Sequence, residues 1–389
     1  MKSKQWLVAF EVIALLQQAG FEAYVVGGAV RDTLLGKTVH DVDVTTSALP
    51  QEVQQLFATT IAVGIEHGTV IVVQQDTPIE VTTFRIDGEY IDHRRPEQVH
   101  FVRDLKQDLA RRDFTINAMA MDNNQAIIDY FNGQQDLQAG VLRAVGNAQE
   151  RFAEDALRML RAVRFVAQLG FTVAPATKEA MRHHAPALRF IAIERIKQEL
   201  DKMLVGKNVT AAITLMQDTA LTASLPGVWH AQKWFGFQPT TVIEGWAYMM
   251  HYNRAQPNIM QRYRLTNKEK RAVTSMLEAF DALVERGLTR LDYYRYDEAT
   301  LLGATRIARH FASVKMTDED VIHYKQALPI QNRQALAISG DDLQHWLNKK
   351  PGPWLKQALD KIEAAVIYEE VQNDKQQIRS WYCNGINER

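Results

Sequence analysis

The 389-residue sequence has few of the features that usually reveal a partner or a compartment directly. It has one cysteine, Cys383, which excludes an internal disulfide bond and a zinc site built from several cysteines, and fits a reducing cytoplasm. Its formal net charge is −1, so bulk charge does not indicate a nucleic-acid partner and any basic surface must be local. The apolar segment 6–20 is interrupted by Glu11, lacks a signal-peptide cleavage pattern and is too short to span a bilayer. We therefore expect no membrane partner, and an amphipathic helix that ends at Gly20.

The length predicts two or more domains, because one hydrophobic core rarely organises so many residues. Strand-like runs alternate with helical ones from Tyr24 to about Val145, namely "AYVVGG", "VDVTT", "GTVIVVQ", "IEVTTFRI" and "AIIDY". "RDTLLG", "QEVQQLF" and "LKQDLARRDFTINAMAM" are expected to be helical, as is nearly everything after Ala148. The prediction is an α+β head followed by a long all-α portion. The expected parts are 1–147, 148–206, 207–300 and 301–389.

A glycine pair follows the first strand-like run, in "YVVGG". Gly27 and Gly28 can adopt positive φ and let a ligand approach the backbone closely. A helix is expected to begin just after them, so that its first amides and Arg31 could face a triphosphate. A plain turn remains the alternative.

Two aspartates flank Val42 in a strand-like run, so the side chains of Asp41 and Asp43 should lie on the same face. Two adjacent carboxylates repel each other unless a cation lies between them, and Mg²⁺ prefers such oxygen ligands. Glu80, on a later strand, could be a third carboxylate. The alternatives are an exposed polar strand face for the aspartates and a polar edge position for Glu80.

The segment 154–165, "EDALRMLRAVRF", contains strong helix formers and neither glycine nor proline. At about 100° per residue, its polar side carries Asp155, Arg158, Arg161 and Arg164. Apolar residues occupy the other side, and Leu157 and Phe165 break the division. A solvated charged face is the alternative interpretation. However, three arginines with one aspartate are not arranged as balanced ion pairs.

Asp155 and Arg158 have the polarity that could select a nucleobase. A carboxylate accepts hydrogen bonds and a guanidinium only donates them. Cytosine and adenine present an amino donor beside a ring-nitrogen acceptor, whereas guanine and uracil present the reverse. The pair should therefore accept C and A and leave mispaired groups against G and U, at about 1–3 kcal/mol for each mispaired group.

Several motifs together resemble one family. "GG…DVD…IEV" resembles the nucleotidyltransferase superfamily that includes DNA polymerase β. The longer "VVGGAVRDTLLGKTVHDVDVTTSALP" resembles the class II tRNA nucleotidyltransferases, which comprise the CCA-adding enzymes and bacterial poly(A) polymerases. "DLARRDFTINAMAMD", "NAQERFAEDALRMLRAVRFVAQLGF" and "ERIKQELDKML" agree in the expected order, and "ISGDDL" and "KPGPWL" are similar to the end of the short bacterial CCA-adding enzymes. Asn147 departs from the aspartate that is common there.

The resemblance implies a polymerase-β-like head followed by a helical neck, body and tRNA-binding tail. It implies addition of C, C and A to the 3′ end of tRNA from CTP and ATP with Mg²⁺. Asp41 and Asp43 would hold the metal, and Gly28 and Arg31 the triphosphate. The family's template element would be Asp155 and Arg158. The other implied nucleotide contacts are Arg112, Arg161, Arg164 and, to the ribose, Asp113.

The resemblance also assigns supporting parts. Asn117 would position a loop, Glu154 would orient an arginine, and a mobile loop around "DHRRP" would serve the switch from C to A addition. The basic segment "NRAQPNIMQRYRLTNKEKR" and the corner "KPGPWLKQ", with Lys350, could contact RNA, although helix surfaces and a helix corner explain them equally well. The family suggests a homodimer.

Two other functions stay open. A poly(A) polymerase, or an enzyme that adds only CC or only A, would share the same head. A catalytically silent RNA-binding module belongs to another class, and the intact Asp41-Val42-Asp43 argues against it.

Overall fold

The computed structural model describes residues 4–39, 41–88, 90–91, 95–96, 99–256 and 258–387. The chain forms two compact units. The first comprises Met1–Phe235 with Arg262–Arg264, and the second comprises Gly236–Gln261 with Leu265–Arg389. This division falls at Phe235, and the four-part division expected from the sequence stays a prediction.

A mixed sheet of seven strands forms the centre of the described part of the first unit, in the order β11-β10-β1-β2-β5-β4-β3. Neighbouring strands are antiparallel except β2 and β5, which run parallel. The strands are β1 (Ala23–Val26), β2 (Val44–Thr46), β3 (Thr60–Gly64), β4 (Thr69–Gln74), β5 (Thr77–Thr83), β10 (Met119–Met121) and β11 (Ile127–Asp129). The predicted strand runs are confirmed, and β3 and β10 were missed.

Smaller strand pairs lie beside this sheet. They are β6 (Arg85–Asp87) with β9 (Val99–Phe101), β7 (Tyr90–Ile91) with β8 (Arg95–Pro96), and β12 (Val141–Leu142) with β13 (Thr172–Val173). The predicted mobile loop around "DHRRP" falls here, and its residues 92–94 lie outside the described residues.

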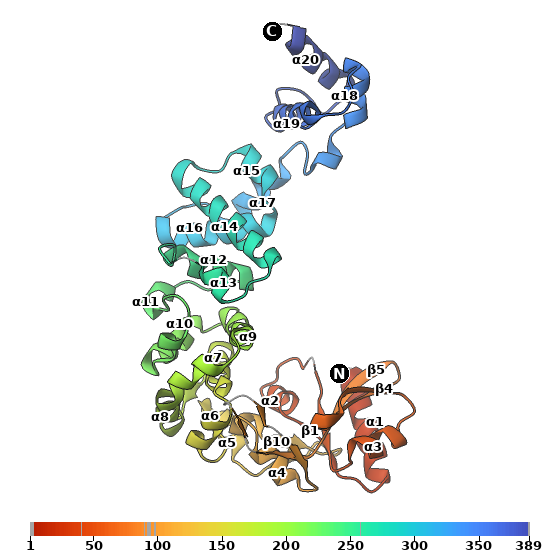
Figure 1. Cartoon of the computed structure of the whole chain (residues 1–389), viewed down its shortest axis with the longest axis vertical. Coiled ribbons are helices and arrows are strands. Elements are labelled where there is room, and N and C mark those ends of the chain that lie inside the picture. Colours follow the sequence, from red (N-terminus) through yellow and green to blue (C-terminus); the bar gives the residue numbers. More distant parts are fainter. Residues whose placement is uncertain are drawn as a thin grey trace. The chain divides into compact units, whose positions relative to one another are not determined.

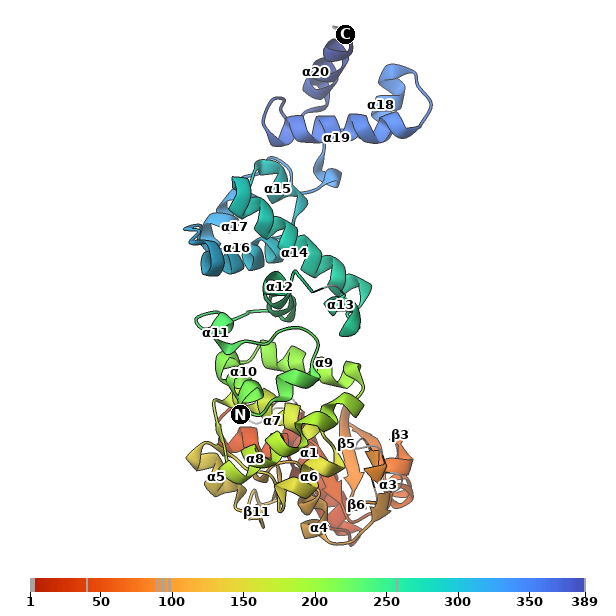
Figure 2. The same ribbon diagram turned by 60° about the vertical axis from the view of Figure 1, so that its left-hand side comes forward.

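Helices of the head fix the turns that carry polar residues. Helix α1 (Lys4–Gln18) packs on β1, β2, β4 and β5, and Gly20 follows it with a φ of 88°. Helix α2 (Gly28–Leu34) begins just after β1 (Figure 1), and α3 (Pro50–Leu56), which is also labelled in Figure 2, packs on β4. Helix α4 (Leu105–Ala110) is shorter than predicted, because the segment "DFTINAMAM" turns through a 3₁₀ helix at Thr115–Asn117 into β10. The helix predicted over that segment is therefore wrong.

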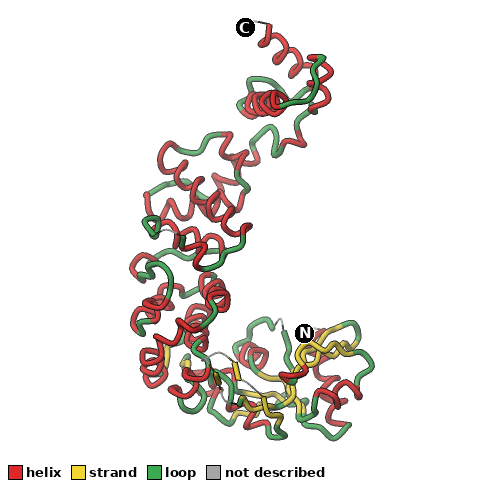
Figure 3. The backbone as a smooth tube through the Cα atoms, in the orientation of Figure 1, coloured by secondary structure: helices red, strands yellow, loops and turns green. Residues whose placement is uncertain are grey.

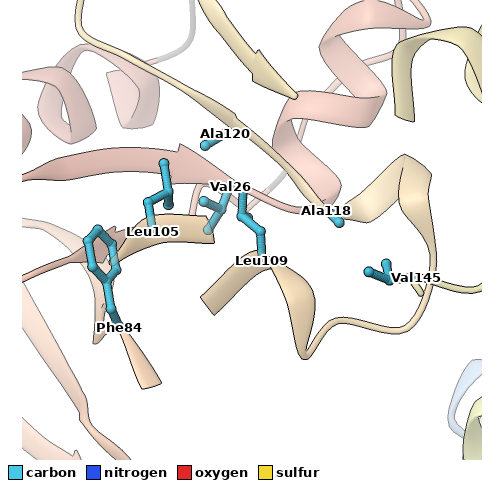
Figure 4. Close-up of a cluster of buried hydrophobic side chains, with 7 residues drawn as sticks. All are labelled: Val26, Phe84, Leu105, Leu109, Ala118, Ala120 and Val145. Atoms are coloured by element: carbon cyan, nitrogen blue, oxygen red, sulfur yellow. The ribbon is translucent and has the colours of Figure 1, made fainter. Parts of the chain in front are cut away.

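One buried cluster fixes the end of α4 against the sheet. Leu105 and Leu109 of α4 contact Val26 of β1 and Ala120 of β10 (Figure 4). The other members are Phe84, Ala118 and Val145. The polar residues that follow Leu109 therefore emerge at a defined edge of the core.

Helices complete the first unit (Figure 1). They are α5 (Gly133–Ala139), α6 (Ala148–Glu154), α7 (Leu157–Leu169), α8 (Pro175–His184), α9 (Ile193–Leu204), α10 (Val209–Asp218) and α11 (Ala231–Trp234), with 3₁₀ helices at Ile65–His67, Ala185–Phe190 and Leu221–Ser224. The single helix predicted over 154–165 is wrong at its start. Asp155 has an extended backbone and its Oδ1 accepts a hydrogen bond from the Leu157 amide at 3.0 Å, so a new helix begins there.

The described part of the second unit contains helices and no named strand (Figure 3). Its helices are α12 (Val242–Tyr252), α13 (Ile259–Arg262), α14 (Asn267–Arg286), α15 (Arg290–Arg295), α16 (Glu298–Ala312), α17 (Asp318–Gln326), α18 (Gly340–Leu347), α19 (Pro353–Ile367) and α20 (Lys375–Asn387), with a 3₁₀ helix at Arg333–Ala335. Helix α14 packs on α12 and α16. None of the described helices has the length and hydropathy that a membrane crossing requires. The predicted α+β head followed by an all-α portion is confirmed.

Candidate active site

A polar cleft of about 540 Å³ lies within the first unit. It is formed by the turn between β1 and α2, the segment after α4, helix α7 and the first turn of α9. Its lining residues are Gly27, Gly28, Arg31, Asp43, Arg111, Arg112, Asp113, Asn117, Asp155, Leu157, Arg158, Arg161, Arg164, Phe165, Gln168 and Arg195. Of the predicted catalytic and nucleotide-binding residues, Asp41 alone does not line it.

The missing side chain of Gly27 leaves room for Arg112 beside the glycine turn. Gly27 has a φ of 71°, and a Cβ there would lie 2.9 Å from Nη1 of Arg112. Gly28 is the first residue of α2 and is not among the glycines with positive φ. Of these two glycines, Gly27 alone uses the positive φ that glycine permits, and the close approach belongs to Gly27.

Three carboxylates belong to two adjacent strand segments: Asp41 and Asp43 come just before β2, and Glu80 lies in the middle of β5. Asp41 and Asp43 are exposed on either side of buried Val42, immediately before β2. Val44 pairs with Val81 in the parallel register, which places Asp43 beside Glu80. Although Asp43 keeps exposed surface, nearby protein displaces much of the water around its carboxylate; this loss of water, and then the charge of Glu80, raise the pKa of Asp43 to about 6. The carboxylates of Asp41, Asp43 and Glu80 repel one another, and their oxygens are suitable ligands for a divalent cation. No group of three or more ligand-type side chains in the described part of the chain forms a ready-made metal site.

Arg31 connects the glycine turn to the segment after α4. Its Nη1 donates to Oδ1 of Asn117 at 2.7 Å, and its Nε and Nη2 donate to Asp32 at 2.9 Å. Asn117 donates in turn to Oδ1 of Asp113 at 3.0 Å. Asn117 thus joins two segments that the sequence places 86 residues apart.

A buried aspartate holds the two arginines after α4. Asp108 has no exposed surface, and it accepts from Nε of Arg111 at 2.9 Å and from Nη2 of Arg112 at 3.3 Å. Burial acts to raise the pKa of Asp108, but the two arginine charges outweigh it and the pKa lies below its ordinary value. Nε of Arg112 is buried without a hydrogen-bond partner among the described residues, so this cleft-lining side chain keeps an unused donor.

Asp113 is likewise buried and ionised. Its oxygens accept from Nε of Arg161 at 2.6 Å, from Asn117 and from the Phe114 amide at 2.8 Å. Burial alone would raise its pKa. The charge of Arg161 and these hydrogen bonds lower the pKa to about 2.

Asp155 and Arg158 are fixed by partners from several elements. Oδ2 of Asp155 lies 3.0 Å from Nη2 of Arg195, a residue of α9. Arg158 donates to Oε2 of Glu154 at 2.6 Å and to the carbonyl oxygens of Arg151 and Arg111. Glu154 therefore contacts an arginine, as expected.

The arginines of α7 are paired with acids that the helix itself lacks. Arg161 pairs with Asp113, and Nε of Arg164 lies 3.2 Å from Oε2 of Glu199 on α9. The expectation of unbalanced arginines thus holds for the helix alone and is wrong for the folded unit, because other elements supply the acids.

Sequence reasoning missed several residues of the cleft. Asp108, which holds two cleft arginines without lining the cleft itself, had a signal, since its spacing to Arg111 and Arg112 places all three on one side of a helix. Arg195 lies in "ERIKQELDKML", which was recognised as a motif without a role. Phe165 was noted only as an exception on the arginine side.

Comparisons with known proteins agree along the whole chain. The model of the poly A polymerase head domain matches residues 23–143. The RNA- and SrmB-binding site of polymerase A matches 170–232, and tRNA nucleotidyltransferase domain 2 matches 237–382. A CCA-adding enzyme of Geobacillus kaustophilus is 43% identical over 396 residues, which cover 96% of this chain and 95% of the relative. The chain belongs to the CCA-adding enzyme family. The CCA-adding enzyme of Bacillus cereus is 39% identical, with 97% of this chain and 98% of the relative covered.

Solved structures of CCA-adding enzymes show the same fold. The crystal structure of the Bacillus stearothermophilus CCA-adding enzyme in complex with CTP matches with a TM-score of 0.85 and 37% identity, covering 100% of this chain and 99% of that one. The Thermotoga maritima CCA-adding enzyme complexed with tRNA matches with a TM-score of 0.67 at 19% identity, which shows the fold alone. The resemblance and the polymerase-β-like head are confirmed, and this family implies the use of a divalent metal ion.

Proposed function

We propose that this protein adds C, C and A to the 3′ end of tRNA, using CTP and ATP and releasing pyrophosphate. The observation that carries the proposal is the composition of one cleft. Asp43 lies at one wall, several arginines line the interior, and Asp155 and Arg158 lie beside them. Transfer of a nucleotide needs these three groups together: carboxylates for metal, cations for the triphosphate and a device that chooses the base.

Asp41 and Asp43 are the residues that would hold Mg²⁺, with Glu80 near enough to raise the pKa of Asp43. The bound metal would supply activation of the tRNA 3′-hydroxyl and stabilisation of the departing pyrophosphate. The chain's own residues bind the triphosphate. Arg31 and Arg112 meet at the glycine turn, where Gly27 leaves room for Arg112. The side chain of Arg112 lines the cleft, and its positive charge supports a contact with an anionic oxygen of the nucleotide.

Asp155 and Arg158 choose the base. Asp155 is held by the Leu157 amide and Arg195, so its carboxylate has a fixed direction. Arg158 is held by Glu154 and two backbone carbonyls. Fixed acceptors and donors reject a mismatched base edge more strongly than mobile ones, because they cannot turn to satisfy it. Asp113 would contact the ribose, and Arg161 and Arg164 would support base and phosphate contacts.

The helical second unit would hold tRNA. Basic side chains lie against aromatic rings in the tail: Lys349 over Trp354, Lys361 near Trp381 and Arg379 near Trp346. Such pairs suit an RNA surface that is recognised by shape and stacking. One solved CCA-adding enzyme contains CTP and another contains tRNA, which supports CTP and tRNA as partners of this protein. The homodimer, the cytoplasmic location and the division at 147, 206 and 300 remain proposals.

The metal assignment is tested by Asp41→Ala and Asp43→Asn. We expect both variants to bind CTP and to lose nucleotide incorporation into tRNA that lacks its 3′ end. Asp76→Asn changes an exposed carboxylate between β4 and β5 and serves as the control. Full incorporation by Asp41→Ala would disprove the assignment, whereas a wild type that binds tRNA and incorporates no nucleotide would support the silent RNA-binding module.

A poly(A) polymerase is the second candidate, because the matching head model carries that name. It is separated by offering ATP and a tRNA that already ends in CCA. A CCA-adding enzyme should leave this tRNA unchanged, whereas a poly(A) polymerase would extend it. An enzyme that adds only CC or only A would fail one of the steps on shortened tRNAs.

A further inference from the structure

Three arginines of the cleft surround one aromatic ring. The guanidinium carbon of Arg164 lies 4.5 Å from the centroid of the Phe165 ring, that of Arg31 lies 5.1 Å away and that of Arg161 lies 5.9 Å away. Arg31 comes from α2, whereas the other two come from α7. Phe165 is one of the two residues that break the polar and apolar division of this helix, and these contacts explain its place on the arginine side.

The ring is itself fixed by the segment that follows Arg112 and Asp113. Phe114 has no exposed surface and packs edge-to-face against Phe165, with ring centroids 5.8 Å apart and an interplanar angle of 88°. An edge-to-face pair holds both rings in one orientation. Phe165 thus connects α7, α2 and the segment after α4, which are the elements that form the cleft.

Phe165 cannot serve as a stacking surface for a base. Its side chain is only 3% exposed, so its faces are covered by protein although it lines the cleft. Its ring is instead a common neighbour of three positively charged guanidinium groups. Each guanidinium has its own carboxylate partner, on Asp32, Asp113 or Glu199, but those carboxylates belong to different elements. Among the contacts of the described residues, the ring is what all three arginines share, and its electron-rich face attracts each cation.

We propose that Phe165 is a positioning residue for nucleotide binding: its ring holds Arg31, Arg161 and Arg164 together in the geometry that receives the incoming nucleotide. The inference rests on the proposed function for the role of those arginines. Without the ring, the three guanidinium groups would be held only by their separate carboxylates and, for Arg31, by Asn117, and their mutual repulsion would separate them. The nucleotide would then have to bring the three arginines together as it binds, and its affinity would fall.

The test compares Phe165→Leu with Phe165→Tyr and Phe152→Leu. Leucine fills much of the space but lacks the ring, and tyrosine retains the ring. Phe152 is equally buried in α6, does not line the cleft, and has no arginine against its ring among the described contacts, so Phe152→Leu is the matched control for lost packing. The readouts are Tm, the KM and kcat for CTP and ATP on tRNA lacking its 3′ end, and binding of CTP and ATP by calorimetry.

We expect Phe165→Leu to lower kcat/KM for CTP and ATP about tenfold, mainly through KM, because the arginines bind the nucleotide before reaction. Phe165→Tyr should stay within about twofold of the wild type, and Phe152→Leu should lower Tm without changing either KM. The inference is wrong if Phe165→Leu keeps both KM values of the wild type while its Tm falls as much as that of Phe152→Leu. It is also wrong if the affinity of Phe165→Tyr for CTP and ATP falls as much as that of Phe165→Leu.

Two further arms keep the result decisive. If Phe165→Leu does not fold, Phe165→Met fills the space with an unbranched side chain and is judged by the same criteria. If the wild type binds CTP and ATP but does not extend tRNA, the proposed function fails, while the calorimetric comparison of the variants still decides the role of Phe165.

Discussion

Asp155→Asn separates base selection from folding, because it preserves the size of the side chain and changes its charge and polarity. Oδ1 of Asp155 accepts from the Leu157 amide at 3.0 Å, and Oδ2 lies 3.0 Å from Nη2 of Arg195. The carboxylate can only accept hydrogen bonds, whereas asparagine replaces one acceptor with a donor. If the remaining oxygen caps α7, the new NH₂ group faces Arg195 and the amino group of C or A. Both are donors, so the contact becomes repulsive.

The two consequences differ in size. The side chains of Asp155 and Arg195 are 16% and 26% exposed, and the lost ion pair should cost about 0.5–1 kcal/mol of unfolding free energy. A mismatched polar contact to the base should cost about 1–3 kcal/mol, which is roughly 5- to 150-fold in kcat/KM. The effect on nucleotide choice therefore exceeds the effect on stability.

The assay measures kcat/KM for CTP, ATP, UTP and GTP on tRNA that lacks its 3′ end, together with Tm. For Asp155→Asn we expect the values for CTP and ATP to fall and those for UTP and GTP to stay or rise. Asp201→Asn is the control, since Asp201 pairs with Lys197 at 2.7 Å on the same α9, is 22% exposed and does not line the cleft. An equal loss for all four nucleotides would refute the template argument, as would the same change in selectivity in Asp201→Asn.

Other predictions follow from the same contacts. The pKa of Asp43 is raised to about 6, so the folded protein favours the protonated carboxyl group. Without divalent metal, the stability that this preference contributes is fully present below the ordinary pKa of an aspartate and is lost as pH rises through about 6. Asp43→Asn should therefore melt above the wild type at about pH 7.5 and not at about pH 4, and the same Tm difference at both pH values would contradict this. Gly27→Ala places a Cβ 2.9 Å from Nη1 of Arg112 and should raise the KM for CTP and ATP about tenfold. Gly20 has a similar φ but open space around it, so Gly20→Ala is the control and should leave both KM values unchanged. Equal KM values in the two variants would count against a role for the close approach of Arg112 to Gly27. In the second unit, Asp292 of α15 accepts hydrogen bonds from Arg286 and from Thr289. Burial acts to raise the pKa of Asp292, but these hydrogen bonds lower it to about 2, so Asp292→Asn should lose roughly 1–2 kcal/mol of unfolding free energy at neutral pH. That difference should shrink as pH falls from about 4 to 2, and a pH-independent loss in denaturant titrations would show that the charge is not responsible.

The sequence was most informative where the chemistry needs specific residue types close together. Asp41 and Asp43 flank a buried valine as expected, and Asp43 and Arg31 line one cleft. The helix positions of Arg158, Arg161 and Arg164 were also predictable, because α7 follows the period of an ordinary helix from Leu157 onward. Local patterns suffice for such features.

Features that depend on partners distant in sequence were not predictable. Nothing near Asp155 in the sequence indicates Arg195, which lies 40 residues away. The acids that balance Arg161 and Arg164 come from other elements, so a single helix cannot reveal them. The break at Asp155 was missed because its neighbours are strong helix formers, whereas its carboxylate favours the start of a new helix.

The most direct test of the function is the order of nucleotide addition to three tRNA substrates, which end before the CCA, after the first C and after the second C. With CTP alone, we expect the first to gain two nucleotides, the second to gain one and the third to gain none. With ATP alone, only the third should grow, and by a single nucleotide. Growth beyond the third position with ATP alone, or addition of A to the shortest substrate, would contradict the assignment of this cleft to CCA addition.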